Sequence, residues 1–415
     1  MSNTPTVPTW IAANWQLDMT LGDWWSCLFE AGYSFPTWPV GLGGLGTNNA
    51  EARAIGQAFG AAGVIAPPNG NGPNMGGPTL LVHGSPEQQQ RFVSPMARGR
   101  HQWCQLFSEP GAGSDLASLA TKAERDGDEF VITGQKVWNS RAEVSEWGML
   151  LARTDPSAPK HRGISFIMID MDQPGVEVRP LVQMNGAAEF CEVFLTEARA
   201  KVSNVIGGLH DGWNVARTTL AHERAAAASG RSRGLVDVMA GGMGGNLDRP
   251  VGELIEHAAR AARDPKRRFE VLLNSRKMID VARESGVAAD PVVRQQLMRY
   301  YIHSEVYRLT GQRGRDNAKS GRVGPEGSIM KLHLAMLAHE SRDLSLAMLG
   351  AEAMVIGADA RDGGRVQNAA LSSFAPSLGG GTNEIQRNII GERTLGLPRE
   401  PSIDSELPFT ERRRS

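Results

Sequence analysis

The hydrophobic period changes twice along this chain of 415 residues, and this change constrains the fold more than any other feature of the sequence. Residues 1–100 and the residues from 206 onward carry apolar side chains at helical spacing, interrupted by glycine and proline. Residues 101–205 instead contain short runs of β-branched and aromatic residues, separated by Gly, Pro and Asp. Helical, then strand, then helical segments predict an α+β protein whose two kinds of element occupy separate domains.

These changes of period divide the chain into four segments. We expect residues 1–100 to form an N-terminal helical domain. We expect residues 101–205 to form a middle antiparallel β domain, because no helical crossover separates its short strands. Long amphipathic helices with short loops predict a C-terminal helical bundle over residues 206–400. Residues 401–415 read as a loose tail whose basic end is solvated.

Two local signals predict the start of a helix and the turn of a hairpin. Ser85 can cap a helix, and Gln88 completes a capping box with it. Asp126 and Gly127 form the turn expected between two antiparallel strands, and residues 128–140 form the second strand. Both signals are local, so they do not depend on the rest of the chain.

Composition and charge exclude several functions. The formal net charge is −1 and the pI is about 6.8, so no excess of cations exists to neutralise nucleic-acid phosphates. Cys27, Cys104 and Cys191 are too far apart for a disulfide framework or a metal-binding motif. No stretch approaches about 18 apolar residues, and the N-terminus lacks the basic and apolar regions of a signal peptide. We expect a cytoplasmic protein with no metal site, no nucleic-acid partner and no membrane span.

Two glycine-rich stretches offer main-chain donors to a ligand. Gly111–Ser114 suits a pyrophosphate, but it lacks the third glycine of a Rossmann fingerprint, and in isolation a surface turn is the better interpretation. Gly379–Gly381 precede a helix for which Asn383 is the expected N-cap and Gln386 its capping partner. A helix N-terminus attracts phosphate or flavin oxygens. A flexible loop before a terminal helix is the alternative.

A glutamate lies in an apolar helical stripe near the middle of the chain. One face of the helix expected over residues 212–231 carries Trp213, Ala216, Leu220, Glu223 and Ala227. Burial would raise the pKa of the Glu223 carboxylate and make it a better base. The alternative is a structural glutamate paired with Arg224 or another cation. His222 points about 100° away from Glu223, and we assign it no chemistry.

Three motifs together resemble those of the acyl-CoA dehydrogenase family. They are FSEPGAGSD at residues 107–115, DGDEFVITGQKVWNS at 126–140 and GGTNEIQRNIIGERTLGLPRE at 380–400, and the resemblance extends from about residue 30 to 400. It implies an N-terminal helical domain, a middle β domain and a C-terminal four-helix domain, with FAD held between the last two in a dimer of dimers. The implied reaction is FAD-dependent α,β-dehydrogenation of an acyl-CoA thioester to the trans-2-enoyl-CoA. Electron-transfer flavoprotein or a similar acceptor is the implied partner.

The resemblance also assigns residues to the cofactor, position by position. Those that would meet the flavin ring, its phosphates or the terminal loop are Phe107, Ser108, Gly113, Ser114, Trp138, Ser140, Thr382 and Glu384. Ser114 would also meet the thioester ligand. The family's arginine that reaches the FAD of a neighbouring subunit is absent, and Arg294 or Gln296 is the expected substitute. The family's Gln-x-x-Gly-Gly reads AMLGA at residues 347–351, so we expect a different set of cross-subunit contacts.

The usual base of the family is missing from this chain. That base is a glutamate immediately before the Gly-Thr of the terminal loop, where this chain has Gly380. Gly380 has no side chain to accept a proton, but its N–H can donate to the thioester oxygen. In a second arrangement within the family, the base is a glutamate beside an arginine on the first long helix of the C-terminal domain. Glu223 and Arg224 match that arrangement, so Glu223 is the expected base, and we expect Arg224 to orient it or to contact CoA.

Two other functions are compatible with the sequence. Because the usual base is absent, the chain could be a non-catalytic or FAD-holding subunit of a heteromeric acyl-CoA dehydrogenase. It could also be a flavin oxidase or monooxygenase on the same scaffold. The acyl group can be straight, branched or steroid, although a base on the bundle helix favours bulky chains in the family. The sequence also leaves open a homodimer or homotetramer and a heterotetramer with a related chain.

Overall fold

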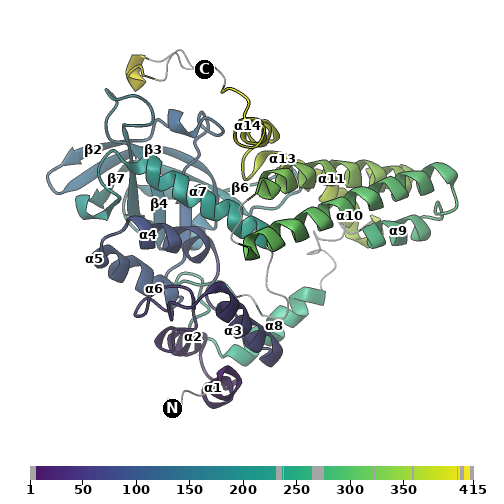
Figure 1. The fold of residues 1–415 in the computed structure, drawn as a ribbon, viewed down its shortest axis with the longest axis horizontal. Helices are drawn as coiled ribbons and strands as arrows, with labels where there is room; N and C mark the ends of the chain where they lie inside the picture. The colour runs from purple at the N-terminus through teal and green to yellow at the C-terminus, as the bar shows by residue number, and fades with distance from the viewer. Residues whose placement is uncertain are drawn as a thin grey trace. The chain divides into compact units, whose positions relative to one another are not determined.

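The structure is a computed structural model of the chain, and it describes residues 6–229, 236, 238–263, 275–320, 324–357, 359–399, 401 and 406–411. The chain forms two compact units, and Figure 1 shows their elements in chain order. Unit 1 comprises Met1–Val182, Ala188–Ala259 and Ser402–Ser415. Unit 2 comprises Gln183–Ala187 and Arg260–Pro401. The expected base and most of the expected cofactor residues therefore belong to unit 1.

The N-terminal part of unit 1 is helical, as the sequence predicts. Its segments are α1 (Val7–Asn14), α2 (Leu21–Glu30), α3 (Asn49–Ala62), η1 (Gly72–Gly76), α4 (Gly77–His83), α5 (Pro86–Gln88), η2 (Gln89–Val93) and α6 (Ser94–Ala97). The capping box is confirmed, because the Gln88 N–H donates to the Ser85 hydroxyl and the Ser85 N–H donates to the Gln88 side chain. Trp24 is fully buried in the core of these helices, and α8 (Val251–Arg263) packs on the same core.

The middle part of unit 1 is one eight-stranded sheet. Its strands are β1 (Trp103–Leu106), β2 (Lys122–Asp126), β3 (Glu129–Ser140), β4 (Trp147–Arg153), β5 (Ile164–Asp170), β6 (Val176–Leu181), β7 (Phe190–Lys201) and β8 (Val205–Ile206). They lie in the order β6-β7-β3-β2-β4-β5-β8, and β1 pairs with β4. The hairpin predicted at Asp126 and Gly127 is confirmed, since it joins the antiparallel strands β2 and β3.

The sheet is mostly antiparallel, as expected, but β4 departs from this pattern. This strand pairs in parallel with β1 and, through one residue pair, with β2. Parallel pairing requires a long crossover connection, which is most often a helix. Here the connection from β1 to β4 runs through residues 107–146 and contains the strands β2 and β3 instead of a long helix. Its first part, residues 107–121, carries the FSEPGAGSD motif, so the segment expected to bind the cofactor lies at the start of this connection.

One long helix of unit 1 packs on the sheet. This helix, α7 (Gly212–Ser229), contacts β5, α4 and η1 (Figure 1). The predicted apolar stripe is confirmed for Trp213, Ala216 and Leu220, which pack on the core between the sheet and the N-terminal helices. The side chain of Ala227 lies outside the described residues. Because α7 is fixed along its apolar face, the residues on that face have defined positions relative to the sheet.

Unit 2 is helical, as expected. Its elements are α9 (Ser275–Glu284), α10 (Pro291–Lys319), α11 (Glu326–Leu349), η8 (Gly350–Met354), η9 (Arg361–Gly364), α12 (Arg365–Ser372), α13 (Ala375–Leu378) and α14 (Asn383–Arg393). The central helix is α11, which contacts α9, α10, α12, α13 and α14. The expected C-terminal domain begins at residue 206, whereas the long segment of unit 2 begins at Arg260. Among the described residues, no helix is long and apolar enough to cross a bilayer.

The N-cap of α14 differs from the prediction by one residue. Thr382 has the extended conformation of a cap, and its hydroxyl accepts from the Ile385 N–H at 3.3 Å. Asn383 is instead the first helical residue, and its side chain donates to the Ser377 hydroxyl at 3.4 Å. Gln386 donates to the Gly380 carbonyl at 3.0 Å and does not complete a capping box. The Asn383 side chain is used by Ser377 instead, and Thr382 provides the cap.

Residues 406–411 are not part of a loose tail, which corrects the expectation for residues 401–415. The Phe409 N–H donates to the Ala158 carbonyl at 3.0 Å. The Phe409 ring lies over the Arg153 guanidinium, whose central carbon is 3.9 Å from the ring centroid. Phe409 and Arg153 are far apart in the chain, so no local sequence pattern predicts their contact.

Candidate active site

Strand β3 carries an exposed tryptophan whose backbone is strained. The register of β3 against β7 shifts between Lys136 and Asn139, and Trp138 within this bulge has φ of 64°. A left-handed conformation is unfavourable for a bulky residue and persists only where the surroundings impose it. The Trp138 side chain is 56% exposed, with Phe190 packed edge-on at 5.7 Å. The bulge therefore holds an indole ring at the surface in a fixed orientation.

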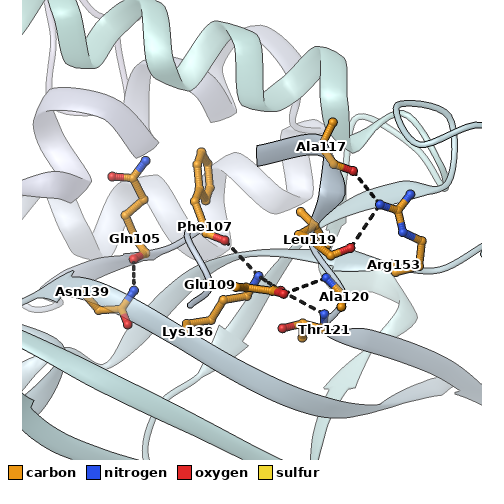
Figure 2. A network of polar contacts seen from close by, with 10 residues as sticks. All are labelled: Gln105, Phe107, Glu109, Ala117, Leu119, Ala120, Thr121, Lys136, Asn139 and Arg153. Atoms are coloured by element: carbon orange, nitrogen blue, oxygen red, sulfur yellow. Dashed lines mark hydrogen bonds and ion pairs between the residues drawn. The ribbon is translucent and has the colours of Figure 1, made fainter. Parts of the chain in front are cut away.

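The residues around Trp138 bind the backbone of the segment that follows β1 (Figure 2). The Lys136 ammonium donates to the Phe107 carbonyl at 3.0 Å, and the Asn139 amide donates to the Gln105 carbonyl at 2.7 Å. The N–H of the residue after Lys136 donates to the Ser108 carbonyl at 3.0 Å. Three of the four carbonyls of Gln105–Ser108 thus accept hydrogen bonds from β3.

A buried ion pair anchors the same segment. Glu109 accepts from the Lys136 ammonium at 2.8 Å and from the N–H groups of Ala120 and Thr121 at 2.7 and 2.9 Å (Figure 2). Lys136 is fully buried. Burial alone would raise the pKa of Glu109, but the Lys136 ammonium and the backbone donors hold that pKa below its usual value. Both ends of the segment between Glu109 and Thr121 are therefore held by one carboxylate.

Sequence reasoning missed this pair, although one signal was present. Phe130 and Ile132 are buried on the core face of β3, and Lys136 has the same parity along the strand. A lysine on a core face requires a buried partner. Glu109 lies within the FSEPGAGSD motif, where the family resemblance assigns roles to Phe107, Ser108, Gly113 and Ser114 but none to Glu109.

The segment between Glu109 and Ala120, here called the open segment, has free space around its glycines. A Cβ added at Gly111 or Gly113 would meet no atom within 4 Å. No described residue forms a hydrogen bond with the hydroxyls of Ser108, Ser114 or Ser140. A loop with exposed main chain, free hydroxyls and rigid ends is suited to an anionic, polar ligand such as a pyrophosphate. With the exposed Trp138 ring, this donor set fits a flavin dinucleotide.

Glu223 lies on the apolar face of α7, on the same side of the helix as Ala216. Its closest described partner is Gln105, whose amide donates to the carboxylate at 3.4 Å. Burial raises the pKa of Glu223, while the Gln105 hydrogen bond and the charge of Arg224 oppose that shift. Arg224 itself is exposed. A partly buried carboxylate with a raised pKa, hydrogen-bonded to Gln105 of β1, has the properties of a general base.

The terminal loop in unit 2 carries glycines and an exposed glutamate, in contrast to the partly buried Glu223. Gly380 and Gly381 have φ of 65° and 89°, a conformation that favours glycine. Glu384 is exposed and pairs with Arg387 at 3.1 Å. A hydrogen bond from its own N–H, supported by neighbouring donors, lowers the pKa of Glu384. An exposed carboxylate with a lowered pKa is a weaker base than a partly buried one with a raised pKa, which favours Glu223 over Glu384.

The predicted site residues fall into two groups. Unit 1 holds Phe107, Ser108, Gly113, Ser114, Trp138, Ser140, Glu223 and Arg224. Unit 2 holds Arg294, Gly380, Thr382 and Glu384, and Arg294 is exposed on the first turn of α10. Within unit 1, Gln105 connects the two sets of residues. Its carbonyl accepts from Asn139 of β3, and its amide donates to the expected base Glu223.

Family models match nearly the whole chain. The N-terminal domain of acyl-CoA dehydrogenases matches residues 4–100, the middle domain matches residues 104–198 and the C-terminal domain matches residues 255–395. The chain therefore belongs to the acyl-CoA dehydrogenase family and is an enzyme of that class. The family and its three-part fold are confirmed as the sequence motifs predict.

Individual relatives refine this assignment. Acyl-CoA dehydrogenase IpdE1 of Mycobacterium tuberculosis is 36% identical over 384 residues, which is 91% of this chain and 88% of IpdE1. Among solved structures, the Tcur3481-Tcur3483 steroid ACAD has 27% identity and a TM-score of 0.67, with 91% of this chain and 89% of that chain covered. The ChsE4-ChsE5 complex from Mycobacterium tuberculosis has 26% identity and a TM-score of 0.64, with 95% and 96% covered. Two of these relatives are thus described as pairs of different chains.

Proposed function

We propose that this enzyme catalyses FAD-dependent α,β-dehydrogenation of an acyl-CoA thioester, with Glu223 as the base that removes the α-proton. One observation carries the proposal: Glu223 is a partly buried carboxylate with a raised pKa, hydrogen-bonded to Gln105 of β1, in a chain whose usual base position is Gly380. The product is the trans-2-enoyl-CoA.

In unit 1 the residues that would hold FAD are Phe107, Ser108, Gly113, Ser114, Trp138 and Ser140. The family resemblance also assigns Arg294, Thr382 and Glu384 to cofactor binding, with Arg294 reaching the FAD of a neighbouring subunit. The free serine hydroxyls and the exposed indole support the first set. When bound, FAD would supply the acceptor for the hydrogen that leaves the β-carbon with its electron pair.

The chain's own residues would handle the proton. A C–H beside a thioester is a weak acid, so its removal requires a base in contact and donors for the charge that develops on the carbonyl oxygen. Gln105 binds Oε2 of Glu223 and leaves Oε1 to take the proton. The Gly380 N–H would donate to the thioester oxygen, Ser114 would contact the same ligand, and Arg224 would orient Glu223 or bind CoA.

We propose a bulky, steroid-derived acyl group as the substrate. A solved relative with 27% identity is described as a steroid ACAD, and the terminal loop carries glycines instead of bulky side chains. We further propose a heterotetramer with a related chain, because two relatives are described as pairs of different chains. A homo-oligomer is the alternative, electron-transfer flavoprotein is the proposed acceptor, and a cytoplasmic location is part of the proposal.

A thioester panel tests the function and the substrate class together. We expect kcat/KM for a steroid side-chain thioester to exceed that for a short straight-chain thioester by at least about tenfold, because a wide pocket gains little from a small chain. The assay follows enoyl-CoA formation with an artificial electron acceptor, first with the chain alone and then with a related chain added. Activity that requires oxygen and no other acceptor would point to an oxidase instead.

The Gln105 contact makes a prediction about pH. The Gln105→Leu variant should shift the acidic limb of the pH profile of kcat/KM to higher pH. Glu223 acts only when ionised, and removing a donor to the ionised form raises the pKa of Glu223 further. Gln135→Leu on β3 is the control and should leave the limb in place. A lower profile without a shift would mean that Gln105 acts only through packing.

A further inference from the structure

We infer that residues 406–411, here called the C-terminal strap, position residues 107–121 through Arg153. Residues 107–121 are called the cofactor loop from here on. The strap follows the helices of unit 2 in sequence, but it belongs to unit 1. The proposed reaction gives the strap no part in binding FAD or in moving the proton. The contacts of the strap do not depend on the proposed function. The test that measures FAD dissociation does rest on it.

The strap is fastened to the β4–β5 connection by main-chain contacts. Besides Phe409, the Thr410 N–H donates to the Pro156 carbonyl at 3.3 Å, and Pro408 forms a bridge with Pro159. The Phe409 side chain is half-buried, whereas Leu407 beside it is 41% exposed. Phe409 therefore makes the main apolar contact of the strap, and Glu406 adds an exposed ion pair with Arg162 at 3.6 Å.

Arg153 connects the strap to the cofactor loop. Its guanidinium donates to the carbonyls of Ala117 at 2.7 Å and Leu119 at 3.1 Å (Figure 2). It also donates to the Lys160 carbonyl at 2.7 Å. Arg153 is only 3% exposed, and the Phe409 ring covers it at 3.9 Å. Removing the ring would admit water to a guanidinium that now bonds to the loop, and water would compete for those bonds.

A second connection runs from the same β4–β5 loop. The Lys160 ammonium binds both carboxylate oxygens of Asp115 at 2.8 and 2.9 Å. Asp115 directly follows Ser114 in the open segment, and Lys160 directly follows Pro159, which pairs with the strap. The strap therefore acts on the cofactor loop at Asp115 and on the Ala117–Leu119 backbone.

The test uses Phe409→Ala, with Leu407→Ala on the same strap as the matched control and Phe409→Tyr as the variant that keeps the aromatic face. We expect Phe409→Ala to speed FAD dissociation by about tenfold, the scale of one desolvated cation–π contact. It should raise the KM for acyl-CoA with little change in kcat. Phe409→Tyr should restore the parent values, and Leu407→Ala should match the parent throughout.

Hydrogen exchange of residues 117–121 supplies a readout that needs no cofactor. The Ala120 and Thr121 amides should exchange faster in Phe409→Ala than in Leu407→Ala. Equal exchange and equal FAD dissociation in the two variants would overturn the inference. If the parent retains no FAD, the proposed function has failed, and the exchange comparison still decides the role of the strap.

Discussion

Replacing Lys136 by methionine is expected to lower the free energy of unfolding of unit 1 by about 3–5 kcal/mol, because it leaves a buried carboxylate without its cation. Glu109 would keep its two backbone donors but lose the ammonium 2.8 Å away. The Phe107 carbonyl would lose its donor as well. The loss combines an uncompensated charge with an unsatisfied carbonyl.

Urea unfolding followed by tryptophan fluorescence measures this effect. All nine tryptophans lie between Trp10 and Trp213, so the signal reports unit 1. Lys122→Met is the control, because Lys122 forms an exposed pair with Glu124 at 2.8 Å that contributes no more than about 1 kcal/mol. Adding Glu109→Gln to Lys136→Met removes both charges and should recover part of the loss. An equal effect of the two lysine variants would contradict the role of the buried pair.

The Glu223→Gln variant is expected to reduce kcat by about 100- to 10,000-fold, because a positioned base contributes that much to proton abstraction. Glutamine keeps the size of the side chain and its hydrogen-bonding capacity toward Gln105, so folding and FAD content should be unchanged. Glu124→Gln, an exposed glutamate on β2, is the control and should retain full activity.

The competing base position can be tested in the same background. Glu384→Gln should not reproduce the loss of proton abstraction, because Glu384 is exposed and its pKa is lowered. Adding Gly380→Glu to Glu223→Gln should recover activity only in part, since φ of 65° disfavours a side chain at that position. Partial recovery would indicate that both positions face the same substrate carbon. A large loss in Glu384→Gln with full activity in Glu223→Gln would move the base to unit 2.

The features that the sequence predicted are those with a local cause. The Ser85 capping box, the Asp126–Gly127 turn and the α7 stripe each depend on neighbouring residues, so periodicity and turn chemistry are sufficient to identify them. The order of helical and strand segments follows from the same local periods.

The features that it missed depend on contacts across the chain. The parallel pairing of β4 with β1 and β2 joins strands that other strands separate in the chain, so no local pattern encodes it. The strain at Trp138 follows from the register of β3 against β7, which no single strand encodes. The partners of Lys136 and Arg153 lie in the cofactor loop and in the strap, and only the folded chain brings them together.

The candidate site shows the same division. Glu223 is proposed as the base because a helical stripe and the absence of a glutamate at position 380 both favour it. Its partner Gln105 could not be predicted, because the two residues meet only through an amide contact between β1 and α7. Sequence patterns therefore identify the residue that carries the charge more readily than the residue that positions it.

The most direct test of Glu223 as the base is anaerobic rapid mixing of the FAD-loaded enzyme with a reactive acyl-CoA, followed by flavin absorbance. A single turnover separates proton abstraction from product release and from the electron acceptor. We predict that the parent enzyme loses its flavin absorbance rapidly and that Glu223→Gln, with equal FAD content, does so about 100- to 10,000-fold more slowly. Equal rates in the two proteins would contradict the assignment of Glu223 as the base.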